Sequence, residues 1–501
     1  MKITAFGHIA YLLEMTGEEG AEPVRILGDP WLSDYAAGDL MGRFPRLRFD
    51  ASALPALDAI FISHSHTDHF DPESLVGLWR DLPNQPFLLL PQSLRHLDSL
   101  LREFLAGVEI RYLSQGDSVE VRGVEFSAYF NPETRATNED DVMVLVAKSA
   151  REVFLSESDA LLPFYDPETR EHVSQPVFAK GVETACFLTA KNELEASMSM
   201  LSASDLEDRQ ARISRSLERT YAEIEEIFVP FEGLEADLWG ADHLVRFVGG
   251  QGMCYPQALD SQWNHVLFPI RLSDRANMER EIAEQCGHAL SISEFEPGTT
   301  YTLEGGNIAS AESATFLETL DREEERFFQP SLEVYDDFPV APLREGERNA
   351  DEQERQILEK LNGRFLPYLI GARNPPLEHL LAANEGGEYR IRIRYGTLNG
   401  FRDRDYVVSF DACEFIGREV EAEADEHYWA NDLEDVFEGV VDEFSIFCRK
   451  PIGGKAQRFW ACLGLPFLNG DLVAKKLRSH FERAARGESL EAWVLPFYEH
   501  G

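Results

Sequence analysis

Short apolar runs separated by turn residues dominate the chain from residue 1 to about residue 160. Runs such as 57–63, 87–90 and 124–130 have the length and composition of buried β-strands. Segments 72–82 and 93–106 lie between such runs and are typical of helices. Strands with helices inserted between them predict a layered α/β protein.

The pattern changes further along the chain. Apolar positions over 193–228 recur mostly at helical spacing with charges between them, which predicts one or two long helices. An expected strand at 244–248 leads into the glycine-rich stretch 249–252, which favours a tight turn at the rim of a site. We expect three parts: a first domain over 1–270, an acidic connecting region over 271–350, and a second α+β domain over 351–501.

One short loop holds most of the candidate chemistry. After the strand at 57–62 the chain reads Ser63-His64-Ser65-His66-Thr67-Asp68-His69, so three of its 13 histidines are close together. Asp71 and Pro72 then form the expected N-cap and first residue of a helix. The loop therefore connects the carboxyl end of a strand to the amino end of a helix.

The spacing within this loop suits metal binding. In an extended loop His64 and His66 point the same way and can reach one cation, whereas Asp68 and His69 project toward a second point nearby. Imidazole combined with carboxylate suits zinc, iron or manganese. The opposing interpretation is a cluster of exposed loop histidines. It gives no folding reason for placing four ionisable residues at the end of a strand.

The motif H-x-H-x-D-H, matched in full by His64, His66, Asp68 and His69, resembles the signature of the metallo-β-lactamase superfamily. The resemblance covers residues 1 to about 270 and implies a four-layer αββα sandwich with metals at one edge of its sheets. It also implies a supporting acid after an early strand, for which Asp29 is the candidate. A bridging aspartate at a strand end is implied as well. Asp159 is the first choice and Glu157 the second.

The same resemblance implies two further histidines that this chain does not place where they are expected. No histidine occurs between residues 130 and 141, and four side chains there could substitute: Asn131, Glu133, Asn138 and Glu139. After the strand at 244–248 the candidates are Cys254 and Tyr255, flanked by His243 and His265, which are more typical of structural histidines. One metal with a depleted second position is therefore as consistent with the sequence as two metals.

The order of later segments is similar to the non-Rieske part of the CMP-N-acetylneuraminate monooxygenase family. Segments 244–256, 406–410 and 432–449 carry this resemblance. The chain contains no C-x-H…C-x-x-H pair, so an oxygenase of this kind would need an electron-donor protein as its partner. The simplest interpretation of the second domain is a packing or dimerisation unit. As a dimerisation unit it would make the protein a homodimer.

The charge of the chain narrows the class of partner. It has 47 Lys and Arg against 89 Asp and Glu, a formal net charge of −42. This excess opposes binding to nucleic-acid backbones and to anionic membranes, and it favours a soluble, cytoplasmic protein that acts on a small molecule. The six cysteines include no C-x-x-C pair, the N-terminus resembles a first strand more than a signal peptide, and no apolar run is long enough to span a membrane.

We therefore expect a metal-dependent hydrolase with one or two divalent ions, either zinc or iron, with manganese as a further option. The expected metal ligands are His64, His66, Asp68, His69 and Asp159. Asp68 would orient a metal-activated water or accept its proton during attack on an ester, amide or phosphodiester. Two alternatives stay open: an iron-dependent oxygenase with an external electron donor, and a non-catalytic metal-binding protein with a degenerate site.

Overall fold

The structure is a computed structural model of the 501-residue chain. It describes residues 1–130 (except 19 and 37–41), 142–160, 167–191, 234–254, 270–321, 350–372, 389–397, 400–409, 411–417, 424–438, 448–449, 458–463 and 469–488, with a few residues at 218–222. All but those few residues of the helices expected over 193–228 lie outside the described part. Among the described residues, no helix has the length and apolar character needed to cross a membrane.

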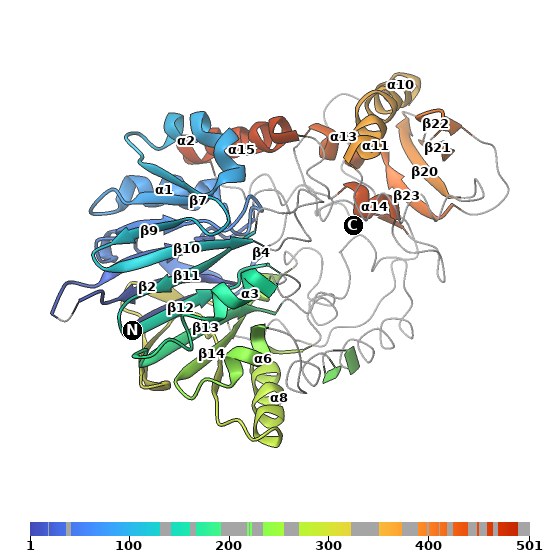
Figure 1. The fold of residues 1–501 in the computed structure, drawn as a ribbon. Helices are drawn as coiled ribbons and strands as arrows, with labels where there is room; N and C mark the ends of the chain where they lie inside the picture. The colour runs from blue at the N-terminus through green and yellow to red at the C-terminus, as the bar shows by residue number, and fades with distance from the viewer. Residues whose placement is uncertain are drawn as a thin grey trace.

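Two stacked β-sheets form the centre of the N-terminal unit (Figure 1). The first has the order β18 (Asn307–Ser313), β17 (Thr299–Glu304), β1 (Lys2–Gly7), β2 (Ala10–Met15), β3 (Val24–Gly28), β6 (Ala59–Phe61), β7 (Phe87–Pro91) and β8 (Ile110–Leu113). The second has the order β16 (Ser291–Glu294), β14 (Leu244–Gly249), β13 (Thr184–Ala190), β12 (Glu152–Ser156), β11 (Met143–Lys148), β10 (Val124–Phe130) and β9 (Ser118–Val121).

The strands are apolar on both faces because both faces of each sheet are covered. In β7, Leu89 points into the core between the sheets, whereas Leu88 and Leu90 point into the core beneath the outer helices. This alternation follows from the two-residue period of a strand. Strands β3, β6, β7 and β8 also pair in parallel, an arrangement that requires crossover connections and cover on both faces.

Helices complete the outer layers. Helices α1 (Pro72–Asp81) and α2 (Asp98–Phe104) contribute apolar side chains to the core on the first sheet. Helices α3 (Pro167–Ser174), α6 (Leu234–Trp239) and α8 (Leu272–Gln285) do the same on the second sheet. The layers are therefore α, β, β and α, and the expected four-layer sandwich is confirmed.

The sequence predicts that the first unit ends at residue 270, but in the structure it continues beyond this residue. Helix α8 and strand β16 extend the second sheet, β17 and β18 extend the first, and β19 (Leu317–Thr319) pairs with β5 (Leu47–Phe49). The expected acidic connecting region over 271–350 is thus part of the sandwich up to Thr319. The sequence of β17 and β18 looks polar because acidic residues such as Glu304 and Glu312 are exposed, whereas Tyr301 and Leu303 of β17 are buried.

The second unit is a five-stranded mixed sheet with helices, in line with the expected α+β domain. Its strand order is β22 (Glu414–Gly417), β21 (Gly400–Ser409), β20 (Arg390–Thr397), β23 (Glu426–Trp429) and β24 (Cys448–Arg449). The helical segments of this unit are α10 (Ala350–Lys360), η6 (Leu361–Phe365), α11 (Leu366–Ala372), α13 (Ala430–Glu438) and α14 (Arg458–Leu463). Helices α10 and α13 both pack on β20.

The last helix, α15 (Asn469–Arg486), corrects the expectation that residues 351–501 form one domain. It lies beside α1 and α2 of the first unit (Figure 1). Leu477 and Phe481 are fully buried in the core beneath those helices, and the Phe481 ring stacks on Phe104 with centroids 5.2 Å apart. The end of the chain therefore completes the helical layer over the first sheet.

Candidate metal centre

The histidine loop lies where strands from both sheets end. Strand β6 ends at Phe61, the loop follows, and α1 begins at Pro72. The N-cap is Asp71, as the sequence predicts, and its carboxylate accepts hydrogen bonds from the backbone N–H groups of Glu73 and Ser74 at 3.2 and 3.1 Å. On the second sheet, β12 ends at Ser156, three residues before Asp159. The two strand ends bring these side chains to one edge of the sandwich.

Six side chains form two adjacent groups of possible metal ligands. One group is His64, His66 and Asp159, and the other is His8, Asp68 and His69. Within each group the ligand atoms lie within 4.8 Å of one another. The structure thus brings together all five residues that the sequence predicts as ligands, and it adds His8.

Asp159 lies between the two groups. Its Oδ2 atom is 3.1 Å from Nε2 of His69 and 3.7 Å from Nε2 of His64. The rings of His64 and His69 have centroids 4.2 Å apart. Asp68 is also close to this ring, with Oδ2 3.6 Å from Nε2 of His69. A carboxylate in this position can contact ions held by both groups.

Asp29 supports the histidines from behind, where the sequence predicts it. Its buried carboxylate accepts hydrogen bonds from Ser63 N at 2.7 Å, Ser63 Oγ at 2.8 Å and Ser158 Oγ at 2.9 Å. It also lies 3.1 Å from Nδ1 of His69. Because a carboxylate can only accept, Nδ1 of His69 carries a proton and Nε2 faces the centre. Nε2 carries a second proton when the imidazole is charged, and it would give up that proton to bind an ion.

The same reasoning applies to His64. Its Nδ1 atom is 2.9 Å from Ser63 Oγ, and the single hydroxyl proton of Ser63 is already donated to Asp29. With the hydroxyl proton of Ser63 assigned to Asp29, Nδ1 of His64 is the donor, which leaves Nε2 as a lone pair. This Nε2 atom is buried and has no hydrogen-bond partner among the described residues. A buried nitrogen of this kind is costly unless something else, such as a metal ion, satisfies it.

The electrostatics also favour a cation. Burial lowers the pKa of His64, and His69 and His66 lower it further, so this imidazole is neutral, as a ligand must be. Burial opposes ionisation of Asp68 and Asp159, but the neighbouring histidines, His69 most of all, together outweigh it and hold the pKa of each carboxyl below its usual range. Burial likewise opposes the charge on His69, yet Asp159, Asp68 and Asp29 together raise its pKa.

Residues on the rim of the centre adopt strained backbone conformations. Asp29, Ser158 and His8 have φ values of 42°, 53° and 52°. The left-handed region costs a non-glycine residue about 1–2 kcal/mol. Strain of this kind persists only where the surrounding structure imposes it, and it clusters at functional sites. The donor atoms, burial and charges therefore fit a site for one or two divalent ions.

His8 is the residue that the sequence analysis missed. The sequence predicts only a first strand at the N-terminus and gives His8 no role in the centre. The one available signal is its position as a polar residue between apolar Phe6 and Ile9 at the end of β1. Its side chain is buried, and its ring lies edge-on to His69 with centroids 5.2 Å apart.

The other candidate ligands divide into four cases. His243 belongs to neither group, and its Nε2 donates a hydrogen bond to the Val177 carbonyl at 2.7 Å, so it is structural. Glu157 is buried but belongs to neither group. The backbone of Cys254 pairs with Gly42 in the short ladder between β15 (Met253–Cys254) and β4 (Gly42–Arg43). Six more candidates lie outside the described residues: Asn131, Glu133, Asn138, Glu139, Tyr255 and His265.

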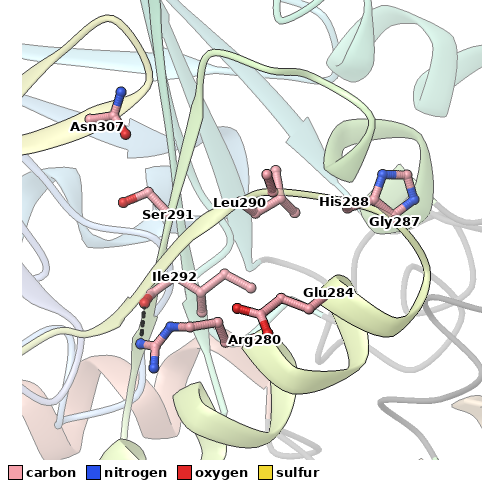
Figure 2. A pocket seen from close by; sticks show the side chains of 9 residues that line it. Arg280, Glu284, Gly287, His288, Leu290, Ser291, Ile292 and Asn307 are labelled. Carbon is pink, nitrogen blue, oxygen red and sulfur yellow. Dashed lines mark hydrogen bonds between the residues drawn. The ribbon is translucent and has the colours of Figure 1, made fainter.

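A separate pocket of about 590 Å³ lies beside the end of α8 (Figure 2). Arg280, Glu284 and His288 line it, together with Asn307 at the start of β18. Arg280 donates a hydrogen bond to the Ile292 carbonyl at 2.6 Å, shown as a dashed line in Figure 2. None of the six possible metal ligands lines this pocket, so it is not part of the candidate centre.

Comparison with known families agrees with this architecture. Residues 2–181 match the family model described as the beta-lactamase superfamily domain. The N-terminal unit is a metallo-β-lactamase superfamily domain. The match includes the histidine loop, Asp29 and Asp159, and it also includes His8.

Individual relatives are similar over short segments only. A segment of 92 residues is 36% identical to an uncharacterised protein of Mycobacterium tuberculosis, covering 18% of this chain and 23% of that one. Another segment, of 75 residues, is 33% identical to a Mycolicibacterium smegmatis protein and covers 15% of this chain and 13% of that one. The name of that protein assigns it provisionally to the Rieske 2Fe-2S iron–sulfur proteins. The chain thus matches less than a quarter of the length of these relatives.

Among solved structures, one similar chain is CmlA, a diiron β-hydroxylase from Streptomyces venezuelae. The sequences are 16% identical, the TM-score is 0.35, and the match covers 60% of this chain and 54% of CmlA.

Proposed function

We propose that this protein is a metal-dependent hydrolase acting on an ester, amide or phosphodiester of a small molecule. The observation that carries the proposal is the position of the Asp159 carboxylate, between the Nε2 atoms of His64 and His69. With Nδ1 of both histidines assigned as a hydrogen-bond donor, Nε2 is the atom of each ring that would bind an ion.

Each side chain then has a role in this proposal. His64, His66 and Asp159 would hold one divalent ion, and Asp68 and His69 with Asp159 would hold a second. A bound ion of this kind lowers the pKa of a coordinated water toward about 7, which supplies a nucleophile at neutral pH. Asp68 would orient that water or accept its proton, for which its ionised, buried carboxylate is suited. His66 is exposed, so the centre opens to solvent on its side.

Metal analysis tests this proposal directly. The protein would be purified without added metal, its metal content measured by mass spectrometry, and turnover of chromogenic esters and phosphodiesters assayed. We expect zinc or manganese together with turnover, and loss of both in His66→Ala. His96→Ala is the matched control, since His96 is exposed and belongs to neither group of possible ligands. Full metal content in His66→Ala would show that the site is assigned wrongly.

A second candidate function is oxygen chemistry at iron with an external electron-donor protein. It is supported by the sequence similarity of 75 residues to the M. smegmatis protein of provisional Rieske class. The same purified protein distinguishes the two functions. Iron in the isolated protein, with oxygen consumption on addition of a reductant and no ester turnover, would replace hydrolysis by oxygenation. Metal binding without either activity would favour the non-catalytic alternative.

A further inference from the structure

His8 is held from two sides by the glycine-rich segment that follows β14. Its carbonyl accepts a hydrogen bond from the backbone N–H of Gly250 at 2.8 Å, in an isolated β-bridge. Gly252 approaches so closely that a Cβ atom there would lie 2.3 Å from Cβ of His8. Only glycine permits this contact at residue 252. The glycine-rich stretch 249–252 therefore packs against His8.

This contact determines which nitrogen of His8 carries the proton. The backbone N–H of Gly252 points at Nδ1 of His8, with N and Nδ1 3.2 Å apart. A backbone N–H can only donate, so Nδ1 accepts and is unprotonated. A neutral imidazole in this position must carry its proton on Nε2.

His8 is in this respect the opposite of His64 and His69. In those two residues Nδ1 is assigned as the donor, to Ser63 Oγ and to Asp29, and Nε2 is the nitrogen left to bind an ion. Metal-binding histidines use this second arrangement, in which the remote nitrogen donates to a carboxylate, carbonyl or water. His8 has no lone pair on the nitrogen that faces the centre, although its Nε2 atom lies within ligand distance of Asp68 and His69.

We propose that His8 is a positioning residue and not a metal ligand, and that its Nε2–H group donates to the Asp68 carboxylate. Nε2 of His8 has no aligned hydrogen-bond acceptor among the described residues. Oδ2 of Asp68 lies 3.1 Å from it, and both side chains are buried, so this oxygen is the acceptor that we assign to the Nε2–H group. The bond would fix the Asp68 carboxylate and leave its other oxygen for an ion or a water. This inference rests on the proposed metal centre.

A consequence follows for the second metal position. Without His8, the described residues supply it with Asp68, His69 and the shared Asp159. With three protein ligands a coordination position stays open, as in catalytic metal sites, whereas a fourth protein ligand closes the position, as in structural sites. The role of His8 therefore bears on whether the centre can admit water and substrate.

Variants at residue 8 test the assignment through metal content. In His8→Gln the amide nitrogen takes the place of Nε2 and can still donate to Asp68, but the amide is a poor metal ligand. We expect His8→Gln to retain the metal stoichiometry of the wild type and His69→Gln to lose one equivalent. His8→Ala should bind metal about 10–100-fold more weakly, the usual cost of losing a partner of a ligand. Loss of one equivalent in His8→Gln, as in His69→Gln, would overturn the proposal.

The tautomer can also be measured in the wild-type protein without metal, so the test survives if a variant fails to fold. Histidine ¹⁵N spectra distinguish protonated Nε2 from protonated Nδ1, and the signal missing from His8→Gln or His8→Ala, whichever folds, identifies residue 8. We expect protonated Nε2 in His8 and protonated Nδ1 in His69. Protonated Nδ1 in His8 would refute its role as donor. A wild-type protein that binds no metal would refute the proposed function but not this hydrogen bond, so the two failures are distinguishable.

Discussion

Oδ2 of Asp159 lies 3.1 Å from Nε2 of His69, although 90 residues separate them in the chain. The contact joins the end of β12 in one sheet to the loop after β6 in the other. It places a carboxylate oxygen close to the Nε2 atoms of two imidazoles, His69 and His64. The candidate centre is therefore built from the junction of the two sheets.

Asp159→Asn should disrupt this junction. The amide keeps the size of the side chain but removes its charge, and one of its two terminal atoms can no longer bind a cation. We expect the loss of at least one equivalent of metal and of any turnover, measured by mass spectrometry and by assay. Asp81→Asn is the control, because Asp81 forms an exposed ion pair with Arg80 away from the centre. Unchanged metal content in Asp159→Asn would exclude the proposed bridging role.

Asp29→Asn tests the support behind His69. The amide NH₂ group cannot accept the hydrogen bonds that both carboxylate oxygens now accept from Ser63, Ser158 and His69. We expect metal affinity to fall about 10–100-fold while the ligands themselves are intact. Competition with a chromogenic chelator measures this change. Asp50→Asn is the control, since Asp50 caps a short exposed helix, η1 (Ala51–Ala53). If Asp29→Asn retained its metal against the chelator as well as Asp50→Asn does, the supporting role of Asp29 would be contradicted.

The buried ion pairs of Glu279 predict that the folded protein loses stability in acid. It is fully buried between Arg246 and Arg275, at 2.7 and 2.8 Å. Burial raises its pKa, but the two guanidinium groups outweigh burial and hold the pKa below its usual value of 4.5. A lowered folded-state pKa contributes stability that is present above pH 4.5 and is lost as the pH falls through the folded-state value. Urea unfolding from pH 7 down to pH about 3 should show this loss.

Glu279→Gln should remove that acid dependence and weaken the fold at neutral pH. Breaking a buried ion pair by removing one partner costs about 3–5 kcal/mol, because the remaining charges are left buried. Glu284→Gln is the control on the same helix, since Glu284 is exposed. If Glu279→Gln kept the free energy of unfolding and the pH profile of the wild type, the buried group of Arg246, Glu279 and Arg275 would not stabilise the fold.

Phe481→Ala tests the attachment of α15 to the first unit. The ring is fully buried between α1 and α2, and truncating a buried phenylalanine costs about 3–5 kcal/mol. We expect the free energy of unfolding of the N-terminal unit to fall by about 3–5 kcal/mol. Arg478→Ala, on the same helix, removes an exposed ion pair with Glu103 and should change stability little. A Phe481→Ala variant as stable as Arg478→Ala would show that α15 does not pack there.

The sequence was sufficient for the parts of the centre that are close together in the chain. The strand before the histidine loop, the N-cap at Asp71 and the start of α1 are encoded within a few residues of one another. Their geometry follows from strand periodicity and from the capping of a helix end. Asp159 could also be predicted, because acidic residues directly follow the apolar strand β12.

The remaining features depend on contacts between segments that are far apart in the chain. His8 meets Gly252 across 244 residues, and no local pattern distinguishes it from a histidine buried for packing alone. The amphipathic sequence of α15 shows that it buries one face, but not that α1 and α2 are its partners. Local sequence specifies periodicity and capping, since these involve neighbouring residues. Which surfaces meet depends on the apolar area and the close backbone approaches of the whole fold, and here these place His8 beside Asp68.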